Sequence, residues 1–153
     1  IEHYWQDVGT LDTYYATNMD LLAGTPAFDL FAPGWPIRHR GGQYPPALMR
    51  TAGEHHAEAH YSIMSPGCIV TGGKVRRSIL SPDVHVGPGA SVESSILMPG
   101  VRIGAGARLE RVIVDENVVV PPDTAIGTPD ADRRHFLVTA GGMTVVAEGT
   151  LLG

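Results

Sequence analysis

IVTGGKVRRSILSPDVH (69–85), VGPGASVESSILMPGVR (86–102) and IGAGARLERVIVDENVV (103–119) are three consecutive segments of 17 residues each, and a fourth begins with VPPDTAIG (120–127). Aliphatic residues recur at matching places in these segments. The ladders are Ile69, Val86, Ile103 and Val120; Val75, Val92, Leu109 and Ile126; Ile79, Ile96 and Ile113; Leu80, Leu97 and Val114; and Val84, Val101 and Val118. Such an unbroken period indicates a solenoid, in which each repeat buries its apolar face against the next.

Within a repeat, the aliphatic positions lie six residues apart, as from Val86 to Val92, and a small residue such as Ala90 stands two places earlier. This alternation is typical of short strands that meet at a corner after every sixth residue. Gly87 and Gly104 interrupt any helical interpretation, and they suit corners that need unusual backbone angles. The sequence therefore predicts a mainly β fold, a parallel β-helix of hexapeptide repeats with a 17-residue coil. Proteins with this pattern wind left-handed, against the usual crossover rule.

The segments before the repeats have a different character. Residues 10–23 predict an amphipathic helix, with Thr10 as its N-cap and Gly24 at its end. The apolar residues at helical spacing are Leu11, Tyr15, Met19 and Leu22. Residues 25–62 are rich in Pro and Gly, which predicts an extended linker.

After the repeats, HFLVTAGGMTVVAEG (135–149) predicts two short strands around Gly141 and Gly142, a hairpin that closes the end of the solenoid. We expect three parts: an N-terminal segment that ends with the helix (1–24), a linker (25–62) and the β-helix with its capping strands (63–153).

The composition restricts the classes of partner that this chain can bind. The formal charge of −5 argues against nucleic acid or an anionic membrane, and no apolar run reaches the roughly 18 residues that cross a bilayer. The single Cys68 rules out an internal disulfide and suits the cytoplasm, where we expect it to serve packing. The abrupt start at Ile1 suggests a fragment of a longer protein.

Motifs outside the repeats carry a family resemblance. They are YWQDVGT (4–10), the helix end Asn18-Met19-Asp20-Leu21, Trp35-Pro36-Ile37 followed by Pro45-Pro46-Ala47, SPGCIV (65–70), and Arg134-His135-Phe136 with Gly141-Gly142. In this order they resemble the C-terminal portion of bacterial ADP-glucose pyrophosphorylases, which are glucose-1-phosphate adenylyltransferases. By this resemblance, residues 1–24 are the C-terminal end of an α/β nucleotidyltransferase domain, and residues 10–23 form its last helix.

The resemblance implies an enzyme that makes ADP-glucose and pyrophosphate from ATP and glucose 1-phosphate for glycogen synthesis. It also implies that Asp7 is the later of two carboxylates that hold Mg²⁺, and that Trp5 flanks the sugar. An oxygen ligand suits Mg²⁺, and a helix start three residues after Asp7 favours a phosphate. From the residues alone, Asp7 could equally cap the helix and Trp5 could be a core aromatic. The Gly-rich nucleotide loop of the family is absent from these residues, so we expect this piece alone to be inactive.

Family members also bind sugar-phosphate or nucleotide effectors and are typically homotetrameric. The repeat stacks Lys74, Ser91 and Arg108 on one ladder, and Arg77, Ser94 and Arg111 on another. Rungs about 4.8 Å apart would let these basic residues hold an anion, although a solvated charged face explains them as well. The family's basic effector positions read Asp115-Glu116 and VAEG (146–149) here, which puts that particular mode of binding in doubt.

Other functions of hexapeptide proteins find less support in the sequence. His56 and His60 could hold Zn²⁺ on a helix, but they stand in the Pro/Gly-rich segment without further ligands. A carbonic anhydrase would need several histidines between coils, and His85 is the only one in residues 69–127. It would also be the only candidate base of a hexapeptide acyltransferase, which remains an alternative, as does a purely structural or regulatory module.

Overall fold

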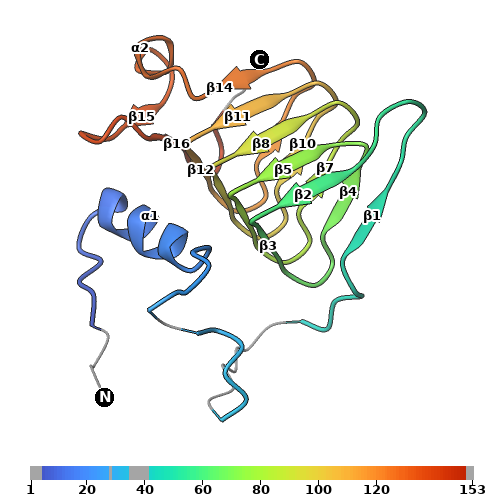
Figure 1. Ribbon diagram of the computed structural model, residues 1–153. Helices are drawn as coiled ribbons and strands as arrows, with labels where there is room; N and C mark the ends of the chain where they lie inside the picture. Colours follow the sequence, from blue (N-terminus) through green and yellow to red (C-terminus); the bar gives the residue numbers. More distant parts are fainter. Residues whose placement is uncertain (1–4, 28, 35–41, 151–153) are drawn as a thin grey trace.

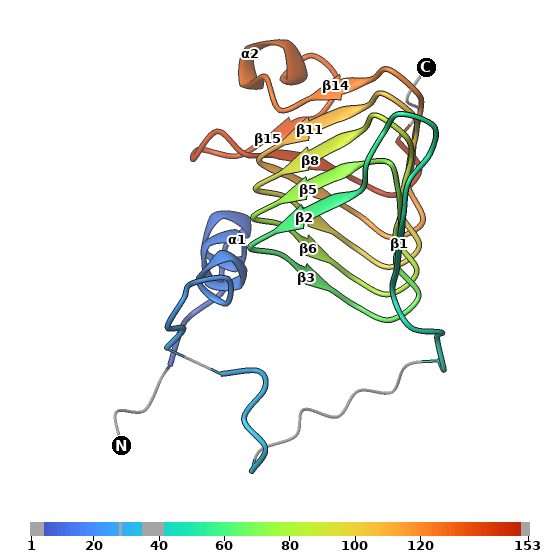
Figure 2. The same ribbon diagram turned by 45° about the vertical axis from the view of Figure 1, so that its right-hand side comes forward.

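The computed structural model describes residues 5–27, 29–34 and 42–150 (Figure 1). In this part of the chain, short strands form a three-sided coil, and one longer helix lies beside it (Figures 1 and 2). Each side of the coil is a sheet whose neighbouring strands come from successive turns. The chain is thus mainly β, as the sequence predicts.

The strands divide among the three sheets in rotation. The first sheet contains β1 (Leu48–Arg50), β4 (Ile69–Thr71), β7 (His85–Val86), β10 (Arg102–Ile103) and β13 (Val119–Val120). The second contains β2 (Glu58–His60), β5 (Lys74–Arg76), β8 (Ser91–Glu93), β11 (Arg108–Glu110) and β14 (Ala125–Ile126). The third contains β3 (Ile63–Met64), β6 (Ile79–Leu80), β9 (Ile96–Leu97), β12 (Val112–Val114), β16 (Thr144–Val146) and β15 (Leu137–Val138).

The core is the column of aliphatic residues that the repeat predicts. Val84 and Val101 are fully buried, and Val118 is 5% exposed. Cys68 is also fully buried in this column, in the packing role expected of it. Each coil therefore covers the apolar residues of its neighbour, which is the main source of stability in a solenoid.

The predicted ladder that begins at Ile69 is wrong at its first position. Val70, not Ile69, pairs with Val86, and Ile69 pairs with His85. The reason is that β5 begins five residues after the start of β4, whereas β8 begins six residues after the start of β7, so the repeat is locally one residue shorter. Val70 is accordingly fully buried, whereas Ile69 keeps part of its surface exposed.

The range predicted as a linker includes two strands of the first coil. β1 pairs in parallel with β4, and β2 pairs in parallel with β5. All three residues of β1 are exposed, because no earlier coil covers them. The Pro- and Gly-rich composition of residues 25–62 does not reveal strands this short.

A row of serines stabilises the corner between the second and third sheets. The residues with positive φ at this corner are Tyr61, Arg77, Ser94 and Arg111. The Ser78 hydroxyl donates to the Arg76 carbonyl over 2.7 Å and accepts from the Ser95 amide over 3.1 Å, and Ser95 repeats the pattern with Glu93 and Val112. These hydrogen bonds offset a backbone conformation that costs roughly 1–2 kcal/mol for residues with a side chain.

The predicted hairpin closes the far end of the coil. After β14 the chain leaves the coil through the short helix α2 (Pro129–Asp132) and β15, then returns as β16, which pairs antiparallel with β15 and parallel with β12. The buried Asp132 carboxylate accepts from the Gly127 amide over 2.8 Å and from the Thr144 hydroxyl over 2.6 Å. Asp132 thereby links the start of the segment between β14 and β16, at Gly127, to its end, at Thr144.

The helix α1 (Leu11–Asp20) begins at the predicted N-cap. Thr10 and Thr13 form a reciprocal capping box, each side chain accepting from the other's amide over 3.1 Å. The helix ends at Asp20 instead of continuing to Gly24. None of the described helices has the length and apolarity needed to span a membrane.

The apolar face of α1 is turned slightly from the predicted one. Leu11 is 41% exposed. The side chains that pack against the third sheet are those of Tyr14, Tyr15 and Met19, and they meet Ile96, Ile113 and Met143. The Tyr15 hydroxyl also donates to the Ser94 carbonyl at the serine corner. The helix is therefore docked on one side of the coil (Figure 2).

Candidate functional site

Asp7 and Trp5 lie on the segment that leads into α1. Trp5 is 80% exposed, so it is not the core aromatic that its residue type alone would suggest. Asp7 is exposed as well, and its carboxylate turns toward Gly9, where an added Cβ would lie 3.5 Å from Oδ1. The helix cap is made by Thr10 and Thr13, so Asp7 is not needed for it.

Arg77 and Arg111 lie at the serine corner, next to α1. They flank Tyr15, whose pKa is raised by burial and lowered in part by these two guanidinium groups. Arg111 also donates from Nη2 to the Gly141 carbonyl over 3.1 Å. Of these two arginines, Arg111 is thus partly engaged in holding the hairpin.

A hollow of about 460 Å³ opens between the end of α1 and this corner. Met19, Asp20, Leu22 and Ala23 line it from the helix side, and Tyr61, Arg76, Arg77 and Glu93 line it from the coil. The hollow therefore combines two guanidinium groups, two carboxylates and an aromatic ring. Such a lining can bind the charge and the hydroxyl groups of a phosphorylated sugar.

Lys74 and Arg108 are placed elsewhere, on the outward face of the second sheet. Both stand on one ladder with Ser91, as the repeat predicts. Lys74 is engaged with Glu58, Nζ lying 3.4 Å from Oε1. Arg108 lines a smaller hollow of about 260 Å³ that is also lined by Glu93 and Glu110. The four predicted basic residues therefore occupy two areas of the surface.

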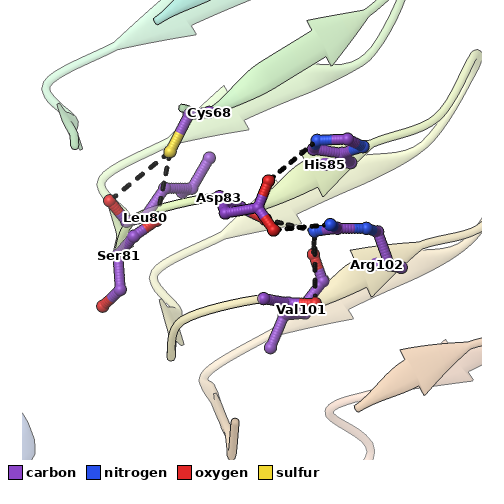
Figure 3. Close-up of polar contacts among 8 residues, drawn as sticks. Cys68, Leu80, Ser81, Asp83, His85, Val101 and Arg102 are labelled. Atoms are coloured by element: carbon purple, nitrogen blue, oxygen red, sulfur yellow. Dashed lines mark hydrogen bonds and ion pairs between the residues drawn. The ribbon is translucent and has the colours of Figure 1, made fainter. Parts of the chain in front are cut away.

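Sequence reasoning missed a polar cluster on the outer face of the first sheet (Figure 3). Arg102 Nη2 lies 2.6 Å from Asp83 Oδ2, and the same guanidinium also donates to the Asp83 carbonyl. His85 Nε2 lies 3.3 Å from the other carboxylate oxygen. The hydrogen bond from Arg102 holds the pKa of Asp83 below its usual range. His85 and Arg102 are direct neighbours in the ladder, a signal that the repeat alone could have supplied.

Two further candidates from the sequence are a Zn²⁺ site at His56 and His60 and the thiol of Cys68. Among the residues that the structure describes, no three His, Cys, Asp or Glu side chains gather as metal ligands. His60 is in β2 and His56 precedes it, so the helical arrangement considered for Zn²⁺ is not formed. The Cys68 thiol donates to the Ser81 carbonyl over 3.1 Å, and burial raises its pKa, which suits a packing role (Figure 3).

The repeated three-sided coil defines a hexapeptide-repeat protein. Residues 45–146 match the family model described as GlmU-like, C-terminal hexapeptide, and the chain belongs to this family. It is homologous to the C-terminal third of glucose-1-phosphate adenylyltransferases, in agreement with the resemblance found in the motifs.

Three relatives illustrate the similarity, and each is a glucose-1-phosphate adenylyltransferase. The protein of Koribacter versatilis is 46% identical over 145 residues, which cover 94% of this chain and 35% of the relative. That of Deinococcus radiodurans is 43% identical over 149 residues, 95% of this chain and 36% of the relative. That of Arthrobacter sp. is 45% identical over 149 residues, 95% of this chain and 32% of the relative. The chain thus spans about a third of the length of these relatives.

Proposed function

We propose that this chain is the C-terminal part of a glucose-1-phosphate adenylyltransferase, which makes ADP-glucose and pyrophosphate from ATP and glucose 1-phosphate. The observation that carries the proposal is the exposed Asp7 carboxylate on a segment leading into a helix docked on a hexapeptide solenoid. The motif around Asp7 lies in a chain that is 46% identical to a protein of that name. In the reaction, a phosphate oxygen of the sugar attacks the α-phosphorus of ATP, the α–β phosphoanhydride bond breaks, and pyrophosphate leaves.

Asp7 fits the role of a Mg²⁺ ligand. Mg²⁺ retains several waters and is bound by one or two carboxylates together with the substrate phosphates, so a single exposed carboxylate is a sufficient contribution from this part of the chain. When bound, the ion would neutralise charge on the phosphates. Asp7 would hold it at the entrance to α1. The N-terminal end of a helix favours anions, because its amide groups point toward them.

Trp5 is the second substrate contact of the proposal. Its indole ring is 80% exposed, so it is free to lie against a sugar. Trp5 and Asp7 lie two residues apart on the same described segment, and this closeness supports a shared role in holding the sugar phosphate.

The second part of the proposal is an effector site for a sugar phosphate or nucleotide. Support comes from the hollow at the serine corner, which contains Arg77, and from Arg111, which like Arg77 is close enough to Tyr15 to lower its pKa. Lys74 and Arg108 would extend the basic area over the second sheet. Within the described residues, no carboxylate lies within 4 Å of the Arg77 or Arg111 side-chain nitrogens.

Assembly into a homotetramer is the third part of the proposal. Leu48 and Val119 are 45% and 62% exposed on the two ends of the first sheet. Exposed apolar side chains of this kind are covered when subunits associate. The cytoplasm remains the expected compartment.

The alternative of a hexapeptide acyltransferase rests on His85. A base needs access to a substrate hydroxyl or amine, and His85 Nε2 instead faces the Asp83 carboxylate beside Arg102. Only Nδ1 is then left to act on a substrate, so an acyltransferase would have to use this nitrogen of His85 as its base.

The full-length protein tests the proposal directly. We expect incubation with ATP, glucose 1-phosphate and Mg²⁺ to give equal amounts of ADP-glucose and pyrophosphate, measured by anion-exchange chromatography. Omitting the sugar phosphate serves as the control and should abolish both. Acyl transfer from acetyl-CoA in place of ADP-glucose formation would contradict the proposal.

A further inference from the structure

The start of α1 is joined to the far end of the chain by a side chain that the proposed function does not use. Asp12 Oδ1 accepts a hydrogen bond from the Thr139 hydroxyl over 2.6 Å, and Oδ2 accepts one from the Gly141 amide over 3.3 Å. More than 120 residues separate the two sides of this contact in sequence. The Asp12 carboxylate thus spans the first turn of α1 and the turn between β15 and β16.

The hairpin is shaped to receive this carboxylate. The Thr139 hydroxyl also accepts from the Met143 amide over 3.2 Å, which leaves its own proton directed at Asp12. Gly141 leaves room for the carboxylate, since a Cβ there would lie 2.6 Å from Asp12 Oδ1. Arg111 donates to the Gly141 carbonyl from the coil and so fixes the same turn from the other side.

The contact has a particular place along the helix. The apolar contacts of α1 with the coil come from Tyr14, Tyr15 and Met19, which all follow Asp12 in sequence. Leu11, the other apolar residue of the first turn, is 41% exposed. In the described part of the chain, the hydrogen bonds between this first turn and the coil all come from Asp12. Without Asp12, the residues before Tyr14 would be held only by their own capping box and by the packing of the side chains that follow them.

We propose that Asp12, Thr139 and Gly141 form a clasp that positions the segment bearing Asp7, so that the hairpin at the end of the solenoid controls this segment. Asp12 is a positioning residue and not a catalytic one. Its link to turnover rests on the proposed function of Asp7, whereas the ordering of the segment does not. The clasp gives the solenoid a physical connection to the candidate active-site residue.

Hydrogen exchange of the full-length protein without Mg²⁺ tests the clasp independently of activity. Asp12→Ala and Thr139→Val should each speed amide exchange in residues 5–13 by about tenfold, the ratio expected when a charge-assisted hydrogen bond no longer opposes local opening. Thr139→Ser keeps the hydroxyl and is the matched control, with exchange close to wild type. Because Thr139→Val removes one of the two hydrogen bonds that Asp12→Ala removes, the double variant should exchange no faster than Asp12→Ala alone.

Exchange at wild-type rates in both single variants would overturn the clasp. An effect of Thr139→Val without one of Asp12→Ala would also overturn it, because it would show that only the hairpin had loosened. In the same preparations, we expect the Mg²⁺ concentration at half-maximal rate to rise by about tenfold, in step with the loss of ordering. Faster exchange with an unchanged Mg²⁺ requirement and kcat would contradict the positioning role. Failure of the proposed function is recognised separately, by an Asp7→Asn variant with wild-type turnover.

Discussion

Arg102 binds Asp83 of the preceding coil, with Nη2 2.6 Å from Oδ2 (Figure 3). Because the hydrogen bond from Arg102 lowers the pKa of Asp83 in the folded protein, the ionised carboxylate stabilises the fold. The contribution is fully present above the pKa of an unfolded aspartate and is lost as the pH falls through the lower folded pKa. The side chains of Asp83 and Arg102 are 38% and 36% exposed, so solvent limits the contribution of this pair to about 1 kcal/mol.

The first prediction follows from this pair. Asp83→Asn should destabilise the protein at pH 7, and the difference from wild type should shrink as the pH falls below about 4. Asparagine suits the positive φ of 61° at this position, so the backbone is not the cause. Urea denaturation at a series of pH values measures the difference. A constant difference across the series would contradict the role of the charge.

The second prediction concerns the serine corner. Ser95→Ala removes a donor to the Glu93 carbonyl and an acceptor for the Val112 amide at a fully buried position. We expect the free energy of unfolding to fall by about 1–3 kcal/mol, because the buried amide is left without a partner. Ser62→Ala is the control, since Ser62 is only half-buried at the start of the coil. Equal losses in the two variants would contradict this account of the corner.

The third prediction tests the column of aliphatic residues. Val101→Asp places a charge where the side chain is fully buried, and we expect it to prevent cooperative folding. Val119→Asp is the matched control, because Val119 lies on the next coil, directly after the buried Val118, and is itself 62% exposed. Thermal unfolding followed by circular dichroism compares the two. A normal transition in Val101→Asp would contradict the assigned core.

The fourth prediction addresses the effector site. Arg76 and Arg77 line the same hollow, whereas Arg111 also holds the hairpin, so the double variant Arg76→Gln, Arg77→Gln is the more selective test. We expect stability to stay within about 0.5 kcal/mol and the concentration of a sugar bisphosphate or nucleotide effector at half-saturation to rise by about a hundredfold. The variant Arg108→Gln changes the other basic area, on the second sheet, and so shows which of the two areas the effector needs. An unchanged half-saturation in the double variant would mean that the corner is only a solvated charged face.

The aliphatic period predicts the coil and its ladders because every turn repeats the same packing problem. The period fails at Ile69 and Val70, because these are adjacent aliphatic residues and either could take the inward position of the repeat. The repeat is one residue shorter before β5, and this alone decides that Val70 points inward. The sequence does not predict β1 and β2, for a different reason. Strands of three residues carry too little alternation to stand out in a Pro- and Gly-rich segment.

The candidate site is predictable only where local motifs define it. The motif around Asp7 is recognisable by resemblance, and the ladders correctly bring Lys74 above Arg108. The contact between Asp12 and Thr139 is a different case. It joins residues from opposite ends of the chain that follow no common period, so only the docking of α1 reveals it.

In the proposed function, Asp7 takes part in adenylyl transfer while contributing nothing to the fold. The most direct test of this role is kcat of the full-length Asp7→Asn variant at saturating Mg²⁺, together with the melting temperature. We predict a fall in kcat of about a hundredfold or more with an unchanged melting temperature, because Asp7 is exposed and has no part in the helix cap. Wild-type turnover in this variant would contradict the claim.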